Sequence, residues 1–424
     1  MRSDRGGSRR TFLKYLGGSA AVAGLAGCTN SGGNGGGNGG GNGGDTGDTG
    51  GGSSSPSLKI GGLFPTSGPY SSLGVDQRDA MKTAIKHIAD SDLEVNVDTV
   101  VKDSQLDPQT ALRRAKELVE QENVDVLTGL GSSSAAAAVS KYTNQQGVPL
   151  MITVATDEAL TAKNCNRYVF RSNTHTYQNM KPLAEWSMKN LGTKFATMGA
   201  DYSWGHASVD AFVEVATENG GEVVEQVWPK LGATDYSSQI QKVADTDADF
   251  LVVRCSGADA INSAKQIASF GLKDQMDLIT NQTVNALQGA GDAMIGNYGG
   301  FPYFFTLDNP KNKAFVKTYR DVGDGSYPST YSCTSYVGVQ MLARAAVDAG
   351  STNGDDLVSS LEGIEFDGPK GTMKIRECDH QSTNALWTSK MVKSDEYDFP
   401  VPEIIKKHEP GSNDRPCEET GCNL

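Results

Sequence analysis

Apolar and polar residues alternate along residues 58–424 in a pattern that predicts strands followed by helices. Leu58 to Phe64 is a short apolar run that stops at Pro65, which indicates a strand. Apolar residues at helical spacing from Val75 to Ile88 then predict a helix. Further strands are expected at residues 94–101, 124–127, 148–154, 195–199, 222–228, 250–254 and 278–280. Further helices are expected from Asp107-Pro108 onwards and over residues 135–146, 206–218, 236–243 and 258–270.

This alternation of strands and helices determines the expected fold class. Short connections between the elements predict an α/β protein with parallel sheets that carry helices on both faces. Because the stretch is too long for one such sheet of ordinary size, we expect two doubly wound lobes. A single barrel of eight strand–helix units is the alternative, although eight regular units are not visible.

Residues 1–27 have the features of an export signal. Ser8 to Lys14 matches the twin-arginine pattern at every position, and a weakly apolar stretch rich in glycine and alanine follows. The stretch ends in Leu25-Ala26-Gly27-Cys28, which resembles the lipobox of exported lipoproteins. We therefore expect residues 1–27 to be removed and Cys28 to carry lipid. A short buried helix with a chance pair of arginines is the alternative.

Residues 28–57 form a second segment of unusual composition. From Thr29 to Ser57 the chain contains only Gly, Asn, Ser, Thr, Asp and Pro. No aliphatic or aromatic side chain is available to offset the entropy of ordering, so we expect a flexible tether. Its root-mean-square reach would be about 30 Å.

The charge of the chain limits its partners. The net charge is −13, from 38 basic and 51 acidic residues. This balance provides no global field for nucleic acid, so no nucleic acid partner is expected. Twin-arginine export carries folded proteins and is widely used by halophilic archaea, and an acidic mature chain fits a surface in high salt.

Three predicted strand ends carry polar or aromatic residues. In open parallel sheets, ligands bind beyond the carboxyl ends of the strands. Gly131 to Ser134 precedes a helix, and its hydroxyl and free amide groups suit a carboxylate. Val154-Ala155-Thr156 and Asp201 to Gly205 follow two other strands. The alternatives are plain helix capping for the first two segments and a core position for Trp204.

Sequence patterns of catalysis and metal binding are absent. The chain has no His-Glu-x-x-His, Gly-x-Ser-x-Gly or Walker pattern. Asp245, Asp247 and Asp249 resemble the start of a calcium loop, but Phe250 and Ser256 replace its required Gly and Glu. We therefore expect no enzyme activity, no metal and no cofactor.

Cysteine content predicts disulfides without fixing their pairing. An even number of cysteines in an exported protein favours disulfides, and six cysteines allow 15 pairings. Because Cys417 and Cys422 close a small loop in a polar tail, this pair is the first candidate. The six cysteines other than Cys28 are Cys165, Cys255, Cys333, Cys378, Cys417 and Cys422.

An ordered set of segments between about residues 58 and 395 resembles one family. It is the solute-binding protein of branched-chain amino acid and amide ABC transporters, the Leu/Ile/Val-binding type. Each segment is weak alone, whereas their order and spacing are specific. The segments are Ser67-Gly68-Pro69 with Gly74, Gly131 to Ser134, Val148 to Ile152 leading to Ala155-Thr156, Tyr168 to Arg171, Trp204-Gly205, Thr234 to Ser237, Phe270 to Leu272, a helix from Tyr336 to near Ala349, and Asp379-His380-Gln381.

The resemblance implies a type I periplasmic binding protein fold, with two α/β lobes joined by three crossings. The crossings fall near residues 171–174, 300–303 and 376–379. In the family the ligand lies between the lobes, and hinge closure buries it. The implied divisions are 58–173 with 303–376 for lobe 1, 174–302 with 377–408 for lobe 2, and 409–424 for the polar tail.

The resemblance also implies site residues. The family's carboxylate-binding positions match Ser132, Ala155 and Thr156. The aromatic residue before a glycine in the second lobe matches Trp204, and the aromatic residue ahead of the late helix matches Tyr331. Leu73 and Tyr202 complete this part of the expected ligand-binding set.

Gln282 is the one departure from the family pattern. Branched-chain amino acid binders place an acidic residue there, which pairs with the ligand ammonium. A neutral amide cannot neutralise a buried ammonium. Either Asp201 or Asp259 substitutes, or the ligand is an amide, a urea-like compound or a carboxylate without an ammonium group.

The resemblance implies a lipid-anchored, extracytoplasmic solute-binding protein. We expect a monomer that delivers a small amino acid-like or amide ligand to an ABC permease in the membrane. The first alternative is a sensor that presents the solute to a membrane signalling receptor, and a hydrolase on the same scaffold is a distant third.

Overall fold

A computed structural model describes residues 55–68 and 70–424. The predicted signal segment, Cys28 and nearly all of the predicted tether lie outside the described residues. The first sheet is parallel throughout and has the order β2-β1-β3-β4-β5. Its strands are β1 (Ser57–Phe64), β2 (Asn96–Asp103), β3 (Val126–Gly129), β4 (Leu150–Ile152) and β5 (Val169–Arg171). The associated helices are α1 (Ser71–Ala89), α2 (Pro108–Glu120), α3 (Ser133–Gln146), α9 (Pro310–Val322), α10 (Thr330–Ala349) and α11 (Gly354–Leu361).

The second sheet has the order β14-β13-β10-β9-β8-β6-β7. Strands β6 to β10 are parallel, and β13 and β14 extend the sheet in antiparallel pairing. The strands are β6 (Lys194–Gly199), β7 (Glu222–Val227), β8 (Phe250–Arg254), β9 (Asp277–Ile279), β10 (Tyr298–Phe301), β13 (Leu386–Val392) and β14 (Val401–His408). The helices between them are α4 (Thr176–Asn190), α5 (Ser203–Glu218), α6 (Ser237–Ala244), α7 (Gly257–Ser269) and α8 (Val284–Ala290).

The chain runs between the two sheets three times, after β5, after β10 and after the small hairpin of β11 (Glu365–Gly368) and β12 (Gly371–Lys374). The predicted fold class, two doubly wound α/β lobes, is confirmed. The predicted strand–helix alternation did not include three strands of the second sheet, namely β10 and the antiparallel pair β13–β14. None of the helices in the described part has the length and apolar character that crossing a bilayer requires.

Local sequence signals explain the elements. Asp107 caps α2, because its Oδ1 accepts a hydrogen bond from the backbone N–H of Thr110 at 2.8 Å, and Pro108 is the first helical residue.

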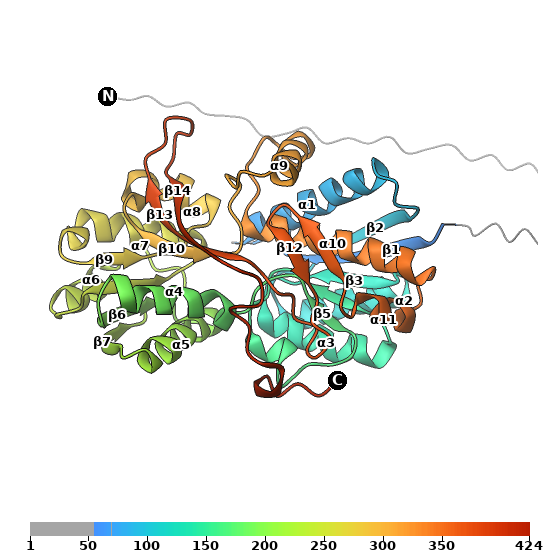
Figure 1. The fold of residues 1–424 in the computed structure, drawn as a ribbon, viewed down its shortest axis with the longest axis horizontal. Helices are drawn as coiled ribbons and strands as arrows, with labels where there is room; N and C mark the ends of the chain where they lie inside the picture. Colours follow the sequence, from blue (N-terminus) through green and yellow to red (C-terminus); the bar gives the residue numbers. More distant parts are fainter. Residues whose placement is uncertain (1–54, 69) are drawn as a thin grey trace, which may run out of the picture. The chain divides into compact units, whose positions relative to one another are not determined.

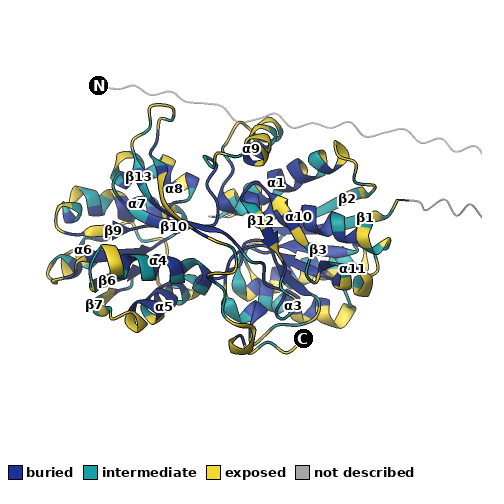
Figure 2. Cartoon of the chain, in the orientation of Figure 1, coloured by how far each residue is buried: buried dark blue, intermediate teal, exposed yellow. Residues whose placement is uncertain are grey.

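Strands β3, β4, β5 and β8 are buried along their whole lengths, and Figure 2 shows buried residues gathered in the sheets. Helix α10 lies beside α1 (Figure 1) and packs on β3 and β4.

The start of α10 differs from the prediction. The helix begins at Thr330 rather than Tyr336, because the Ser329 hydroxyl accepts a hydrogen bond from the backbone N–H of Ser332 and forms a capping box. Tyr331, expected ahead of this helix, therefore lies in its first turn.

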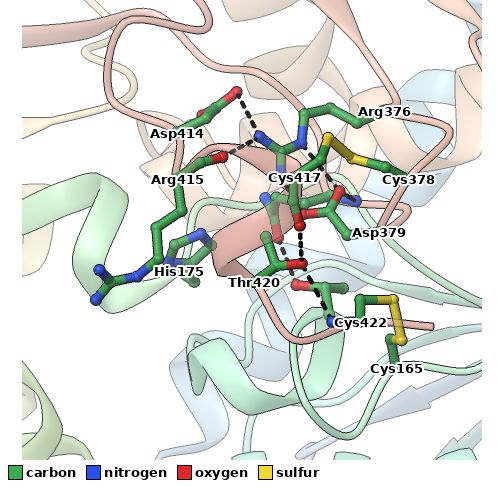
Figure 3. A network of polar contacts seen from close by, with 12 residues as sticks. Cys165, His175, Arg376, Cys378, Asp379, Asp414, Arg415, Cys417, Thr420 and Cys422 are labelled. Atoms are coloured by element: carbon green, nitrogen blue, oxygen red, sulfur yellow. Dashed lines mark hydrogen bonds and ion pairs between the residues drawn. A yellow bond between two sulfur atoms is a disulfide. The ribbon is translucent and has the colours of Figure 1, made fainter.

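The disulfide prediction was wrong. The bonds join Cys165 to Cys422 and Cys378 to Cys417, and no bond links Cys417 to Cys422 within the described chain (Figure 3). The reason is that residues 409–424 do not form an isolated tail. They lie against both parts of the fold, where each cysteine meets a partner distant in sequence.

Arg415 anchors this C-terminal segment between the two lobes. Its guanidinium contacts Glu158, which follows β4, at 2.5 Å and Glu214 of α5 at 2.9 Å. It also lies 3.5 Å from the ring centroid of Tyr177 in α4. Its backbone carbonyl accepts a hydrogen bond from Arg376 at 2.6 Å (Figure 3). The segment therefore contacts residues next to both sheets.

Candidate functional site

A cavity of about 430 Å³ lies at the carboxyl ends of both sheets. In each sheet the strand order reverses once, between β1 and β3 in the first and between β6 and β8 in the second. The loops that leave these strands diverge to opposite faces and leave a crevice, which is where open α/β sheets bind ligands. The lining residues are Tyr70, Leu73, Gln105, Leu106, Gly131 to Ser134, Val154 to Thr156, Tyr202 to Trp204, Leu231, Ser256 and Tyr331.

Seven of the eight residues predicted to bind a ligand meet at this cavity. They come from five separate regions of the chain, so the fold brings together residues that the sequence keeps apart. The volume lies within the range of about 300–1,000 Å³ that small-molecule sites occupy. The seven residues are Leu73, Ser132, Ala155, Thr156, Tyr202, Trp204 and Tyr331.

The first lobe contributes hydroxyl groups next to a helix N-terminus. Ser132 caps α3 by accepting a hydrogen bond from the backbone N–H of Ala135 at 3.4 Å, and its hydroxyl lies 2.9 Å from that of Ser134. Thr156 is 6% exposed, and its hydroxyl has no hydrogen-bond partner among the described residues. Ser132 therefore has a capping role without any ligand, whereas the Thr156 hydroxyl lacks a structural partner.

The second lobe contributes aromatic side chains. Tyr202 and Trp204 lie at the start of α5, with ring centroids 6.0 Å apart. Two more aromatic residues of the lining come from the first lobe: Tyr70, which precedes α1, and Tyr331, which lies in the first turn of α10. Burial raises the pKa values of Tyr70, Tyr202 and Tyr331, so these hydroxyls stay protonated and can donate hydrogen bonds. The walls thus combine flat apolar surfaces with hydrogen-bond donors.

Backbone strain is concentrated at the edge of the cavity. Gln105 and Leu106, which both line it, have φ values of 53° and 56°. Leu130, next to the lining residue Gly131, has a φ value of 67°. Residues other than glycine rarely adopt this left-handed region, and such strain gathers at ligand sites. Sequence reasoning did not identify Gln105 or Leu106, because no local pattern marks them.

Gln282 does not belong to the cavity lining. It is 2% exposed and lies against Gly299 of β10. Its Oε1 accepts a hydrogen bond from Ser389 Oγ at 2.7 Å, and its Nε2 donates to the backbone carbonyl of Asn297 at 3.2 Å. The side chain therefore joins β9, β10 and β13 instead of facing a ligand. Gln282 follows β9, but its amide points into the sheet.

The two proposed substitutes for a family carboxylate also lie outside the lining. Asp201 is exposed, and its Oδ1 lies 2.9 Å from Nε2 of His206. Asp259 is buried, and its Oδ2 accepts a hydrogen bond from the backbone N–H of Gly232 at 3.0 Å. No Asp or Glu side chain lines the cavity in the described part of the chain.

Arg254 is a further candidate that sequence reasoning missed. It is the last residue of β8 and lines a small inner pocket that shares Thr156, Trp204 and Tyr331 with the cavity. A signal was available, because a charged residue directly ends the apolar run Phe250 to Val253. Burial lowers the pKa of Arg254 to about 10, so the guanidinium remains charged at neutral pH.

Comparison with known proteins agrees with this geometry. A family model described as "Periplasmic binding protein" matches residues 57–396. Leu/Ile/Val-binding protein homolog 6 of Brucella melitensis is 26% identical over 368 residues, which cover 84% of this chain and 93% of that protein.

Two solved structures are similar in both sequence and fold. One is the solute binding protein of an ABC transporter from Rhodopseudomonas palustris in complex with 3,4-dihydroxybenzoic acid, at 26% identity and a TM-score of 0.77, covering 83% of this chain and 97% of that one. The other is an ABC transporter substrate-binding protein from Sphaerobacter thermophilus, at 26% identity and a TM-score of 0.79, covering 83% and 98%. The family resemblance predicted from the ordered segments is thus confirmed, and with it the expectation of a binding protein rather than an enzyme. The chain belongs to the periplasmic binding protein family.

Proposed function

We propose that this protein is the extracytoplasmic solute-binding component of an ABC transporter. It captures a small organic solute between its lobes and delivers it to a membrane permease. The observation that carries the proposal is the cavity of about 430 Å³ between the switch points of the two sheets. The relatives from Rhodopseudomonas palustris and Sphaerobacter thermophilus, which are ABC transporter proteins, support the same role.

The proposed solute has a carboxylate or carbonyl end and a flat or apolar body. The polar end would meet the hydroxyls of Ser132 and Thr156 at the start of α3, where free N–H groups favour negative charge. The body would lie among Tyr70, Tyr202 and Trp204. This range includes amino acid-like, amide and aromatic carboxylate solutes, and the last class matches the ligand of the Rhodopseudomonas palustris protein.

Closure of the lobes would complete the site. The proposed divisions are residues 58–173 with 303–376 and residues 174–302 with 377–408, with hinges near residues 171–174, 300–303 and 376–379. Cavity-lining residues come from both divisions, so relative rotation would open and close the cavity.

We also propose that Cys28 is the lipidated first residue of the mature protein. The twin-arginine pattern and the Leu25 to Cys28 lipobox support this. Intact-mass spectrometry of membrane-extracted protein should show a chain that lacks residues 1–27 and carries lipid. A chain beginning at Met1, or membrane association unchanged in Cys28→Ala, would contradict the anchor without affecting the binding function.

Thermal-shift screening in high salt tests the binding function. The panel should contain amino acids, amides, urea and aromatic and aliphatic carboxylates. A solute that binds only the folded protein raises Tm by mass action, about 2.7 kcal/mol of added stability at a hundred times Kd. We expect at least one class to raise Tm. If no solute does, the proposed function is wrong.

A further inference from the structure

Two buried arginines end strands in this fold, and their surroundings differ sharply. Arg171 ends β5 and is fully buried, while Arg254 ends β8 and is 4% exposed. Arg171 donates hydrogen bonds to Gln381 Oε1 at 2.6 Å, to the carbonyl of Asp157 at 2.7 Å and to Thr161 Oγ1. The Arg254 side chain has no hydrogen bond or ion pair to any residue in 55–68 or 70–424, and its Nε is fully buried.

Arg254 shares its pocket with other polar groups that lack partners. The hydroxyls of Thr156, Ser208 and Thr330 line the same pocket, and none has a hydrogen-bond partner in the described chain. Thr156 follows β4, Ser208 belongs to α5 and Thr330 begins α10, so three elements and β8 converge. The pocket encloses about 20 Å³, enough for about one water molecule or one small polar group.

Burying the Arg254 guanidinium and these three hydroxyls without partners costs folding free energy unless another molecule binds to them. Buried polar groups are nearly always hydrogen-bonded, and a buried charge is normally paired. The guanidinium of Arg254 faces the Trp204 ring, whose centroid lies 5.0 Å from the guanidinium carbon. An aromatic face attracts a cation but neither accepts its hydrogen bonds nor neutralises it. A group that satisfied both the charge and these hydrogen-bond donors would be an anion that accepts hydrogen bonds.

Positive charge on a solute would meet no carboxylate in the lining of the cavity or of the inner pocket, as far as the chain is described. Neither the cavity nor the inner pocket is lined by an Asp or Glu side chain of the described residues. Asp201 is directed to His206, and Asp259, outside both linings, accepts a hydrogen bond from the backbone of Gly232 through Oδ2 while its buried Oδ1 has no hydrogen-bond partner among the described residues. An ammonium group held beside Arg254 would add like-charge repulsion to the cost of desolvation.

We propose that Arg254 pairs with a carboxylate, or a similar organic anion, on the solute, and that the solute carries no ammonium group. This inference rests on the proposed function, narrows its solute class and places the anionic end beside Thr156 in the inner pocket, so that Ser132 would meet another part of the solute. The anion enters the inner pocket from the cavity, since the two share Thr156, Trp204 and Tyr331. The hydroxyls of Thr156, Ser208 and Thr330 donate to it together with the guanidinium.

The position of the pocket connects the anion to closure. Its lining includes Asn173, Thr174, Phe301 and Pro302, which lie in two of the three crossings between the sheets. An anion there would contact both lobes and the segments that join them. The solute charge would therefore favour the closed arrangement.

Matched solutes test the proposal on the unmodified protein. Each of three sets contains a carboxylate, its amide and the amino acid with the same carbon skeleton: 3-(4-hydroxyphenyl)propanoate, 3-(4-hydroxyphenyl)propanamide and tyrosine; 3-phenylpropanoate, 3-phenylpropanamide and phenylalanine; 4-methylpentanoate, 4-methylpentanamide and leucine. We expect the carboxylate of at least one set to bind. Its affinity should be at least about a hundredfold higher than that of the matched amide and of the matched amino acid. Amide or amino acid binding as tight as that of the matched carboxylate would overturn the proposal.

Two methionine variants test the residue itself. Arg254→Met should lower carboxylate affinity at least about a hundredfold, yet the solute-free variant should melt at or above the wild-type Tm, because an unpaired charge has been removed. Arg171→Met is the matched control and should lower Tm, since it breaks a satisfied network. If Arg254→Met lowers Tm as much as Arg171→Met, or retains carboxylate affinity, the proposal is wrong.

The outcomes separate this proposal from the proposed function. Binding of amides or amino acids in preference to carboxylates would leave a solute-binding protein and overturn only the role of Arg254. A failure of every solute in the panel to raise Tm or to titrate would overturn the proposed function and this inference together.

Discussion

The guanidinium of Arg254 lies over the indole of Trp204, with its central carbon 5.0 Å from the ring centroid. Arg254 ends β8 and Trp204 follows the neighbouring strand β6, at the point where the strand order of the second sheet reverses. Trp204 lines both the cavity and the inner pocket. The contact with Arg254 therefore links the buried cation to a ring that the proposed solute would meet.

Thr156 and Ser132 should respond differently to loss of their hydroxyls. Thr156→Val keeps the shape and removes a hydroxyl without a protein partner, so we expect affinity to fall about ten- to a hundredfold with little change in Tm. Ser132→Ala also removes the cap of α3 and should cost about 1 kcal/mol of stability besides affinity. Calorimetry and thermal melts measure both. Unchanged dissociation constants in both variants would remove these residues from the site.

Gln282→Glu should destabilise the fold without changing the preferred solute charge. The amide nitrogen of Gln282 donates to the carbonyl of Asn297, and a carboxylate oxygen there would face that carbonyl without a proton. Leaving such a buried group unsatisfied costs about 1–3 kcal/mol, more for a charge. Thermal melts and titrations with leucine and 4-methylpentanoate measure the two effects. Tighter leucine binding by this variant would show that residue 282 reaches the solute after all.

Stability should fall on mild acidification because of His175. Burial, reinforced by the positive charges of Arg171, Arg376 and Arg415, holds the pKa of His175 well below its usual range. The unfolded chain takes up a proton below about pH 6.5, while the folded chain resists it, so stability is present above that pH and lost below it, by up to about 1.4 kcal/mol per pH unit.

His175→Asn should weaken this acid dependence. His175 caps α4, since its Nδ1 accepts a hydrogen bond from the backbone N–H of Gln178 at 3.4 Å, and asparagine can cap in the same way without titrating. Chemical denaturation at pH 7.5 and pH 5.5 gives the comparison. An equally steep loss in the variant and the wild type would assign the effect to other groups.

The disulfides should stabilise the C-terminal segment. Reduction should lower Tm, since disulfides typically contribute about 2–4 kcal/mol. Cys378→Ser with Cys417→Ser should release the segment that holds Arg415, whereas Cys165→Ser with Cys422→Ser should free chiefly its last residues. Thermal melts with and without reductant test this. The control is a variant in which all four cysteines are replaced, and reductant should not change its Tm. Equal Tm values for reduced and oxidised wild type would contradict the prediction.

Much of the fold could be predicted because its signals are local. The periodicity of residues 58–64 and 75–88 identified β1 and α1, and Asp107-Pro108 identified the start of α2. The start of α10 was missed because its cap consists of two serines, Ser329 and Ser332, a pattern that turns share.

A site residue could be predicted where its place in a loop after a strand is enough to bring it to the cavity. It could not be predicted where the direction of its side chain decides whether it reaches the cavity. Thr156 and Trp204 follow strands and necessarily reach the carboxyl edge. Gln282 also follows a strand, but Gly299 leaves space into which its side chain turns. Whether Arg254 is paired, as Arg171 is, depends on contacts with residues far away in the chain. The pairing of Cys165 with Cys422, 257 residues apart, is equally non-local.

The crystal structure of the protein with the solute that raises Tm most would test the central claim directly. The account predicts the solute in the cavity, within hydrogen-bond distance of Thr156, packed on Trp204 and with its anionic group on Arg254. A solute bound elsewhere would contradict the account, for example in the hollow beneath the C-terminal segment that Glu158, Asp210, Glu214 and Arg415 line.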